Sequence, residues 1–78
     1  MDGNTSLANL GRAIRELREK KSVDQDDLAA AADITVEKLL ALEAGKLDPD
    51  YDLMIALAHG LGGTPSTIIL RAEGLIVE

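Results

Sequence analysis

The sequence predicts an all-α domain of five short helices packed as a compact bundle. Apolar residues recur at helical spacing in five consecutive stretches, each stretch follows residues typical of a helix start, and none shows the sustained period-two alternation of a half-buried strand. A chain of 78 residues can build one small core but not two. We therefore expect one domain over residues 7–73, a flexible N-terminal segment over 1–6 and a short apolar tail over 74–78.

The first helix is predicted over residues 7–20, because its leucines and isoleucine fall on one face and its charged residues on the other. Thr5 or Ser6 can cap it. The second helix is predicted from an Asp24 cap to Ala32, with Leu28 and the alanines at 29–32 as its packing face. So many alanines let neighbouring helices approach closely.

Thr35 is the expected cap of a third helix, whose inward face is formed by Leu39 and Leu42. Gly45 is expected to end this helix in the left-handed conformation. A fourth helix over about residues 50–61 and a fifth over 65–73 follow from the aspartates and prolines that precede them. In the fourth helix the residues expected to point inward are Met54, Leu57, Ala58 and Leu61.

Charge is unevenly distributed along the chain. The formal net charge is −6, which argues against unspecific binding to nucleic acid through a broad basic surface. Residues 1–21 nevertheless carry five basic and three acidic residues, whereas residues 22–78 carry three and eleven. One end of the domain can therefore still face phosphate groups.

Several classes of function are disfavoured by composition. The chain has no cysteine, and its single histidine, His59, has no second ligand at metal-binding spacing, so neither metal nor cofactor is expected. No nucleophile is paired with a base, so we expect no enzyme and no small-molecule substrate. No membrane-spanning run and no signal peptide are evident, and a cytoplasmic location is expected.

The stretch "LGRAIRELREKKSVDQDDLAAAADITVEKLLALEAGKLDPD" resembles the lambda-repressor-like, Cro/C1-type (XRE) helix-turn-helix family, and the resemblance continues through "LMIALAHGLGGTPSTII". It covers about residues 7–72 and depends on joint spacing rather than on one motif. The resemblance implies a DNA-binding domain with its helix-turn-helix in the second and third helices, which regulates transcription. It also implies a partly buried ion pair between Arg18 and Glu43, which ties the third helix to the first.

Carried over by position, the family's DNA contacts fall on the start of the second helix, on the third helix and on the turn after it. The candidate DNA-binding residues are Gln25, Thr35, Val36, Glu37, Lys38, Leu40 and Lys46. For Gln25 a purely structural role at the helix start is an equal alternative, and Lys46 alone can be a simple solvated lysine.

The sequence departs from the family pattern in three ways. Asp33 occupies a turn position that is often glycine, although aspartate tolerates the left-handed region. Asp24, Asp26 and Asp27 crowd a helix start that commonly faces phosphate. The third helix lacks the Arg, Asn and Gln side chains that make bidentate contacts with purines, and Val36 with Leu40 can instead form an apolar strip for a protein partner.

The C-terminal stretch contains more apolar residues than one inward face can use, which predicts a homodimer. The candidate interface residues are Ile68, Ile69, Leu70, Leu75, Ile76 and Val77. Alternatively, the tail folds back over its own domain.

The sequence thus predicts a sequence-specific DNA-binding regulator, repressor-like, that binds a palindromic operator in double-stranded DNA as a homodimer. The alternative is a helix-turn-helix module that has lost DNA affinity and binds a protein partner. The operator, and the kind of small regulator within the family, stay open.

Overall fold

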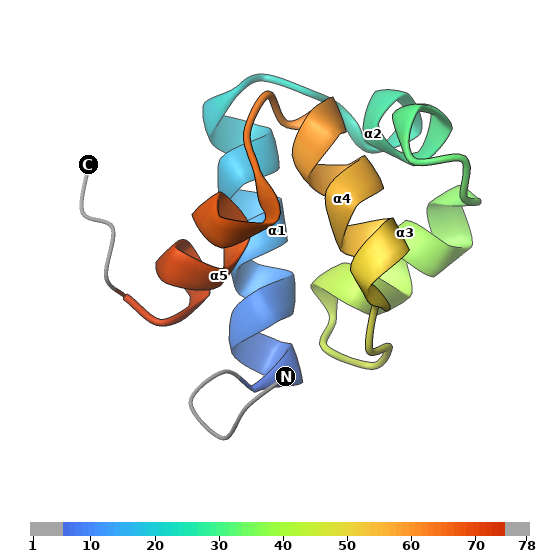
Figure 1. Cartoon of the computed structure of the whole chain (residues 1–78). Coiled ribbons are helices and arrows are strands. Elements are labelled where there is room, and N and C mark those ends of the chain that lie inside the picture. Colours follow the sequence, from blue (N-terminus) through green and yellow to red (C-terminus); the bar gives the residue numbers. More distant parts are fainter. Residues whose placement is uncertain (1–5, 75–78) are drawn as a thin grey trace.

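The computed structural model describes residues 6–74 and contains five helices in this range. They are α1 (Leu7–Lys20), α2 (Gln25–Ala31), α3 (Val36–Glu43), α4 (Tyr51–Gly60) and α5 (Pro65–Ala72). The described residues form no strand (Figure 1). The five-helix, all-α prediction is confirmed, and each helix ends within about one residue of its expected boundary. The predicted cap Thr5 and the predicted interface residues Leu75, Ile76 and Val77 lie outside the described range.

Four of the five helices begin at a side chain that caps the first turn. Ser6 Oγ accepts from the N–H of Asn9 at 3.1 Å, and Asp50 Oδ1 accepts from the N–H of Leu53 at 2.8 Å. Asp24 and Thr35 cap α2 and α3 in the same way. Because such a cap satisfies an orphan backbone donor within three residues, short sequence patterns were enough to locate these helix starts.

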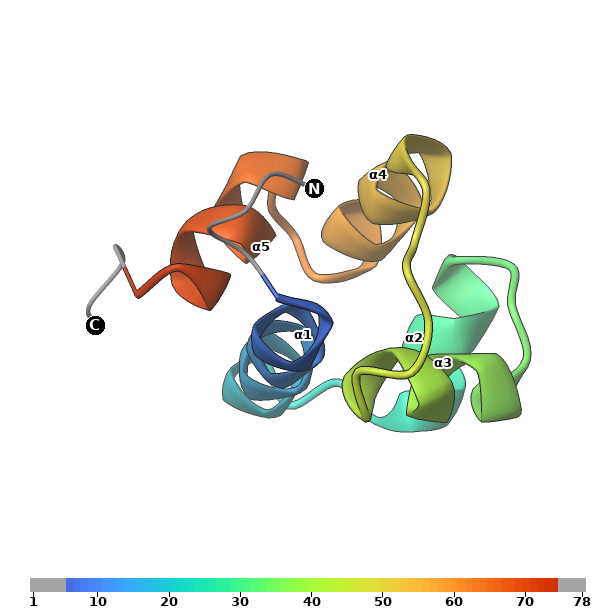
Figure 2. The same ribbon diagram turned by 90° about the horizontal axis from the view of Figure 1, so that it is seen from below.

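The helices form a closed ring around one core. Proceeding around the ring, α1 packs against α3, α3 against α2, α2 against α4, α4 against α5, and α5 against α1. Figure 2 shows α1 lying between α3 and α5, with α4 on the far side of the core. Consequently α3 and α5 lie on opposite sides of α1.

Every helix contributes a fully buried side chain to the core. These are Ile14, Leu28, Leu39, Leu57 and Ile68, each at most 1% exposed. The predicted inward face of α4 is confirmed, because all four of its residues are buried. The alanine face of α2 was drawn too wide, since Ala29 and Ala32 are buried whereas Ala30 and Ala31 are exposed.

The burial of Ile68 corrects its assignment to a dimer interface. The side chain lies in the core because α5 packs against both α1 and α4, so it is not available to another chain. Ile69 is partly buried against the same core, and Leu70 is 38% exposed. Of the described candidates, Leu70 therefore presents the most surface.

Within residues 6–74 no single helix is long and apolar enough to cross a membrane; only α4 and α5 taken together, bent by 94°, reach that length and composition.

Candidate functional site

The turn between α2 and α3 is built by backbone hydrogen bonds and one left-handed residue. The N–H of Asp33 donates to Ala30 O at 3.2 Å, and the N–H of Ile34 donates to Ala29 O at 2.9 Å. Asp33 has φ 58°, as its position in the sequence predicted. The turn therefore ends α2 and redirects the chain into α3 within four residues.

The inner face of α3 is fixed against the core. Leu39 and Leu42 are 0% and 2% exposed, which confirms their predicted role. Gly11 of α1 lies directly against the end of α3, because a Cβ placed on it would be 2.6 Å from Glu43 O. The absence of a side chain at Gly11 thus allows the backbones of α1 and α3 to approach closely.

The outer face of α3 is open to solvent. Thr35, Glu37, Lys38 and Leu40 are exposed, and for Leu40 the exposed fraction is 45%. Val36 was expected to be exposed on this face, but it is half-buried and packs against the core. The predicted apolar strip of Val36 and Leu40 therefore reduces to Leu40.

Arg18 and Glu43 form the ion pair that joins α1 to α3. Arg18 Nε donates to Glu43 Oε2 at 2.8 Å, and Arg18 Nη2 donates to Oε1 at 3.4 Å. Arg18 Nη1 also donates to Val23 O at 3.2 Å, which holds the segment leading into α2. The hydrogen bond to Glu43 raises the pKa of Arg18 above its usual value, assisted by the charge of that carboxylate and opposed by burial.

Gln25 joins this network, which the sequence did not predict. Its Nε2 donates to Glu43 Oε1 at 3.4 Å, and the residue is half-buried at the first position of α2. The Glu43 carboxylate, at the end of α3, therefore joins the end of α1 to the start of α2. This placement supports the structural alternative for Gln25, and it leaves the residue at the edge of the exposed α3 face rather than fully on it.

The charges around α3 are mixed. Lys38 and Lys46 are exposed, and the N–H of Lys46 donates to Ala41 O at 2.9 Å, so the lysine follows directly on the end of α3. Opposite charges lie close to them in the chain, since Glu37 is exposed on α3 and Asp33 in the turn. The start of α2 adds three more exposed carboxylates, Asp24, Asp26 and Asp27. Within the described range, no group of three His, Asp or Glu side chains is arranged to hold a metal ion.

The site residues that sequence reasoning missed act through the backbone. Ser22 adopts φ 57° between α1 and α2, and Gly11 provides the close approach of α1 to α3. A glycine in the middle of a strongly amphipathic helix was an available signal, because alanine is the better helix former wherever space allows. Ser22 had no comparable signal, since serine is not enriched in the left-handed region.

This arrangement of helices matches a known protein family. The family model described as a helix-turn-helix domain matches residues 9–68. The chain belongs to this family. In these terms α2 and α3 are the two helices of the helix-turn-helix, and the turn at Asp33 joins them. No curated protein matches the sequence.

Two solved regulators have similar structures. The clp gene regulator ClgR from Corynebacterium glutamicum superposes with a TM-score of 0.83 at 28% identity, over 91% of this chain and 92% of that chain. A second ClgR structure gives a TM-score of 0.84 at 29% identity, over 87% and 72%. The restriction-modification controller protein C.AhdI from Aeromonas hydrophila gives 0.77 at 26% identity, over 80% and 94%.

Proposed function

We propose that this protein is a sequence-specific DNA-binding transcriptional regulator that binds a palindromic operator as a homodimer and acts as a repressor. The observation that carries the proposal is the exposed face of α3, held rigidly by the turn at Asp33, the buried Leu39 and Leu42, and the Arg18–Glu43 pair. A helix fixed in this way can enter the major groove as a unit. The regulators ClgR and C.AhdI, similar in structure, support the same class of function.

The chemistry of the α3 face determines which bases it can distinguish. The Glu37 carboxylate can accept a hydrogen bond from the N4 amino group of cytosine, and Thr35 or Leu40 can contact a thymine methyl group. Lys38 and Lys46 are placed to neutralise phosphate groups beside the groove. Val36 is half-buried and can add contacts only through its outer edge.

A homodimer would compensate for this small set of base contacts. Two copies of α3, about one helical turn of DNA apart, would read two half-sites and thereby select a palindrome. Leu70 on α5 supports a dimer, because a large apolar side chain lies partly exposed beside the partly buried Ile69. Sedimentation equilibrium at micromolar concentration tests the dimer. Wild type should be dimeric and Leu70→Asp monomeric, whereas Ile55→Asp, at an equally exposed apolar residue on α4, should stay dimeric.

A protein partner is the second candidate function, and the exposure of Leu40 favours it. The net charge of −6 also weakens attraction to nucleic acid. In this case α3 would present Leu40 to an apolar pocket of another protein, and the acidic start of α2 would lie at the rim. With DNA as its partner, the protein would act in the cytoplasm, the location expected from the sequence.

The experiment that decides between these functions is a selection of binders from a random duplex pool at about 50 mM salt, because the phosphate contribution weakens steeply as salt rises. We expect enrichment of a two-fold-symmetric site. Its affinity, measured by fluorescence anisotropy, should fall about tenfold or more in Glu37→Ala, given about 1–3 kcal/mol for each good base contact in two subunits. Lys38→Ala should weaken binding to all sequences alike, because it removes a phosphate contact. Lys21→Met removes a charge from the other side of α1 and should leave the affinity unchanged. No enrichment from a folded protein would overturn the DNA proposal and direct the search to protein partners of Leu40.

A further inference from the structure

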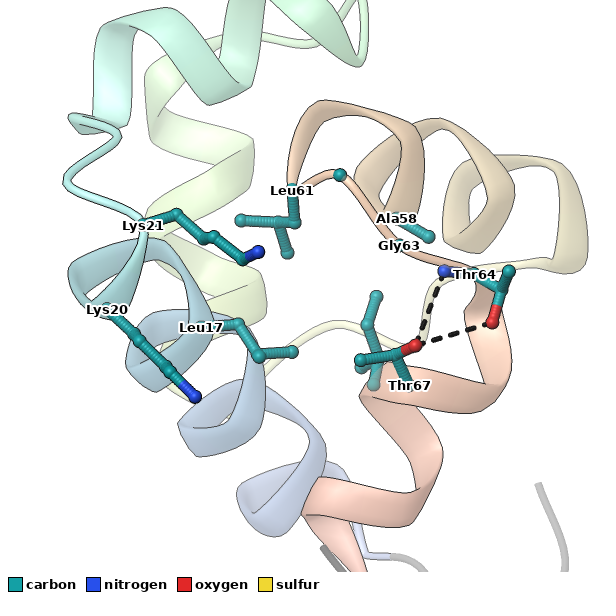
Figure 3. A pocket seen from close by; sticks show the side chains of 10 residues that line it. Leu17, Lys20, Lys21, Ala58, Leu61, Gly63, Thr64 and Thr67 are labelled. Atoms are coloured by element: carbon teal, nitrogen blue, oxygen red, sulfur yellow. Dashed lines mark hydrogen bonds between the residues drawn. The ribbon is translucent and has the colours of Figure 1, made fainter. Parts of the chain in front are cut away.

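A cavity of about 150 Å³ lies between the C-terminal end of α1 and the turn from α4 to α5. Its floor is apolar and is formed by Leu17, Ala58, Leu61 and Ile68, all of which are 5% exposed or less. Figure 3 shows Leu17 of α1 and Leu61, the residue after α4, lining the cavity from different sides. None of the residues proposed to contact DNA belongs to this cavity, so it can act independently of the α3 face.

The rim of the cavity is polar and positively charged. Lys20 and Lys21 come from the end of α1, and they are the charged residues among the described side chains that line the cavity. Figure 3 shows Lys21 extending across the opening toward Leu61. An anion at the rim would therefore meet the Lys21 ammonium group and no lining carboxylate.

Two hydroxyl groups lie on the other side of the opening. Thr64 Oγ1 and Thr67 Oγ1 are 3.4 Å apart, and the backbone N–H of Thr64 donates to Thr67 Oγ1 at 3.4 Å (Figure 3). If one hydroxyl donates to the other, the second hydroxyl still has its own hydrogen to donate outward. The rim thus offers a neutral donor on one side and cationic donors on the other.

Gly63 keeps the polar side of the cavity open. A Cβ placed on it would lie 3.2 Å from Thr67 Oγ1 and 3.4 Å from Thr67 Cβ. Gly63 does not need glycine for its backbone conformation, because its φ is not positive. Its lack of a side chain therefore matters for space beside the Thr67 hydroxyl.

We infer that this cavity binds a small amphipathic monocarboxylate, with its apolar body on the floor and its carboxylate at the Lys21 ammonium group. An enclosed apolar cavity of about 150 Å³ can hold benzene, so a body of about six carbon atoms is the largest that this partly open cavity can accommodate. A carboxylate at the rim can accept from the Lys21 ammonium group, and such charge-assisted hydrogen bonds are stronger than neutral ones. The ligand would therefore bind in one orientation, with its apolar end toward the floor and its carboxylate toward the rim.

Benzoate and benzamide test this inference, because they have the same size and shape but only benzoate carries a charge. We would titrate each into ¹⁵N-labelled protein at constant ionic strength and follow amide chemical shifts. Benzoate should give saturable shifts centred on Leu61, Gly63 and Thr67, with half-saturation at about 10 mM or below, as expected for about nine non-hydrogen atoms. Benzamide should bind about three- to fivefold more weakly, since the ammonium is exposed to solvent.

Two variants and one control complete the test. Lys21→Met keeps the length of the side chain but should weaken benzoate to the level of benzamide, and Gly63→Ala should weaken both ligands by narrowing the site. Lys46→Met removes an equal charge after α3 and should leave benzoate binding unchanged. Equal binding of the two ligands, shifts scattered over the surface, or no saturable shift up to about 50 mM, several times the expected half-saturation, would overturn the inference.

Discussion

Gly11 is the residue at which α1 leaves room for the last turn of α3. A Cβ there would lie 2.6 Å from Glu43 O and 2.8 Å from Glu43 C, both atoms of the backbone, which cannot move aside as a side chain can. In an open helix, alanine in place of glycine stabilises by about 1 kcal/mol. At Gly11 the helices must separate instead, and overpacking of this kind typically costs about 1–3 kcal/mol.

We therefore expect Gly11→Ala to lower the free energy of unfolding by about 2 kcal/mol, measured by urea denaturation followed by circular dichroism. Gly60→Ala is a matched helical control. Its Cβ would meet two side-chain atoms and no backbone atom, Leu28 Cδ1 at 2.8 Å and Ala31 Cβ at 3.1 Å, so the loss should be smaller. A Gly11→Ala protein as stable as wild type would show that α1 and α3 do not need this close approach.

The Arg18–Glu43 pair is a second single-residue feature with a measurable consequence. The side chains are 11% and 6% exposed, so removing one partner leaves a nearly buried charge. We expect Arg18→Met or Glu43→Gln to lower the free energy of unfolding by about 3 kcal/mol, the lower end of the usual cost of breaking a buried pair. Replacing both residues, Arg18→Met with Glu43→Leu, should recover most of that loss, because no unpaired charge remains.

If each single substitution cost less than about 1 kcal/mol, the pair would behave as a surface ion pair and would not organise α2 and α3. Gln25→Ala provides an intermediate case. It removes a 3.4 Å hydrogen bond to Glu43 but strands no charge, so its effect on stability should be small. A large effect of Gln25→Ala on DNA affinity, with little effect on stability, would then assign Gln25 to DNA rather than to the network.

Single residues also mark where sequence reasoning reached its limit. The resemblance to a known family was enough to place Arg18 opposite Glu43, but periodicity could not show that Ile68 is buried. In α5 three consecutive apolar residues compete for one inward face, and the outcome depends on where α1 and α4 lie. Local pattern identifies an apolar face, whereas its exact direction is set by packing that no short window contains.

At the scale of the helices, the ends of each helix were predictable from the sequence, but the way the helices pack against one another was not. A cap acts within three residues, so Asp24 and Thr35 could be identified as caps from the sequence alone. The order of helices around the core depends on long-range contacts and on small residues such as Gly11. For the same reason the half-burial of Val36, one residue after its cap, was not evident from the sequence.

The turn between α2 and α3 offers a test at this scale. Asp33 has φ 58°, a left-handed conformation in which a Cβ atom is sterically strained and which glycine adopts without that strain. Asp33→Gly should raise the free energy of unfolding by up to about 1 kcal/mol. It should also strengthen binding of the selected DNA, because it removes a negative charge beside the proposed phosphate contacts.

Asp33→Asn separates these two effects, since asparagine tolerates the left-handed region but carries no charge. It should strengthen DNA binding as Asp33→Gly does, with little change in stability measured by urea denaturation. Should Asp33→Asn leave DNA affinity unchanged at low salt, the turn would not lie close to a phosphate. In that case the proposed orientation of α3 in the groove would need revision.

At the scale of the whole molecule, the sum of charges opposes DNA binding while their placement permits it. The net charge is −6, yet Lys38 and Lys46 lie on or directly after α3, and the inner side of that helix is neutral and buried. Affinity must then come from a few phosphate contacts rather than from a broad basic surface. Composition predicted this weakness, but only the exposed positions of the lysines show which contacts remain.

The dependence of DNA affinity on salt measures these contacts directly. The slope of log K against log[salt] is about −0.9 for each phosphate that the protein neutralises. Lys46→Met should reduce the magnitude of that slope by about 2 for a dimer, one phosphate in each subunit, while the preferred sequence stays the same. Glu37→Ala should change the preferred sequence and leave the slope unchanged, because a contact with a base affects specificity and neutralises no phosphate.

An unchanged slope in Lys46→Met, measured by anisotropy between about 50 and 200 mM salt, would place Lys46 away from the DNA backbone. Lys21→Met is the charge-matched control, because Lys21 lies on the other side of α1. If both lysine variants changed the slope equally, the net charge of the protein, and not the position of Lys46 beside α3, would govern DNA binding.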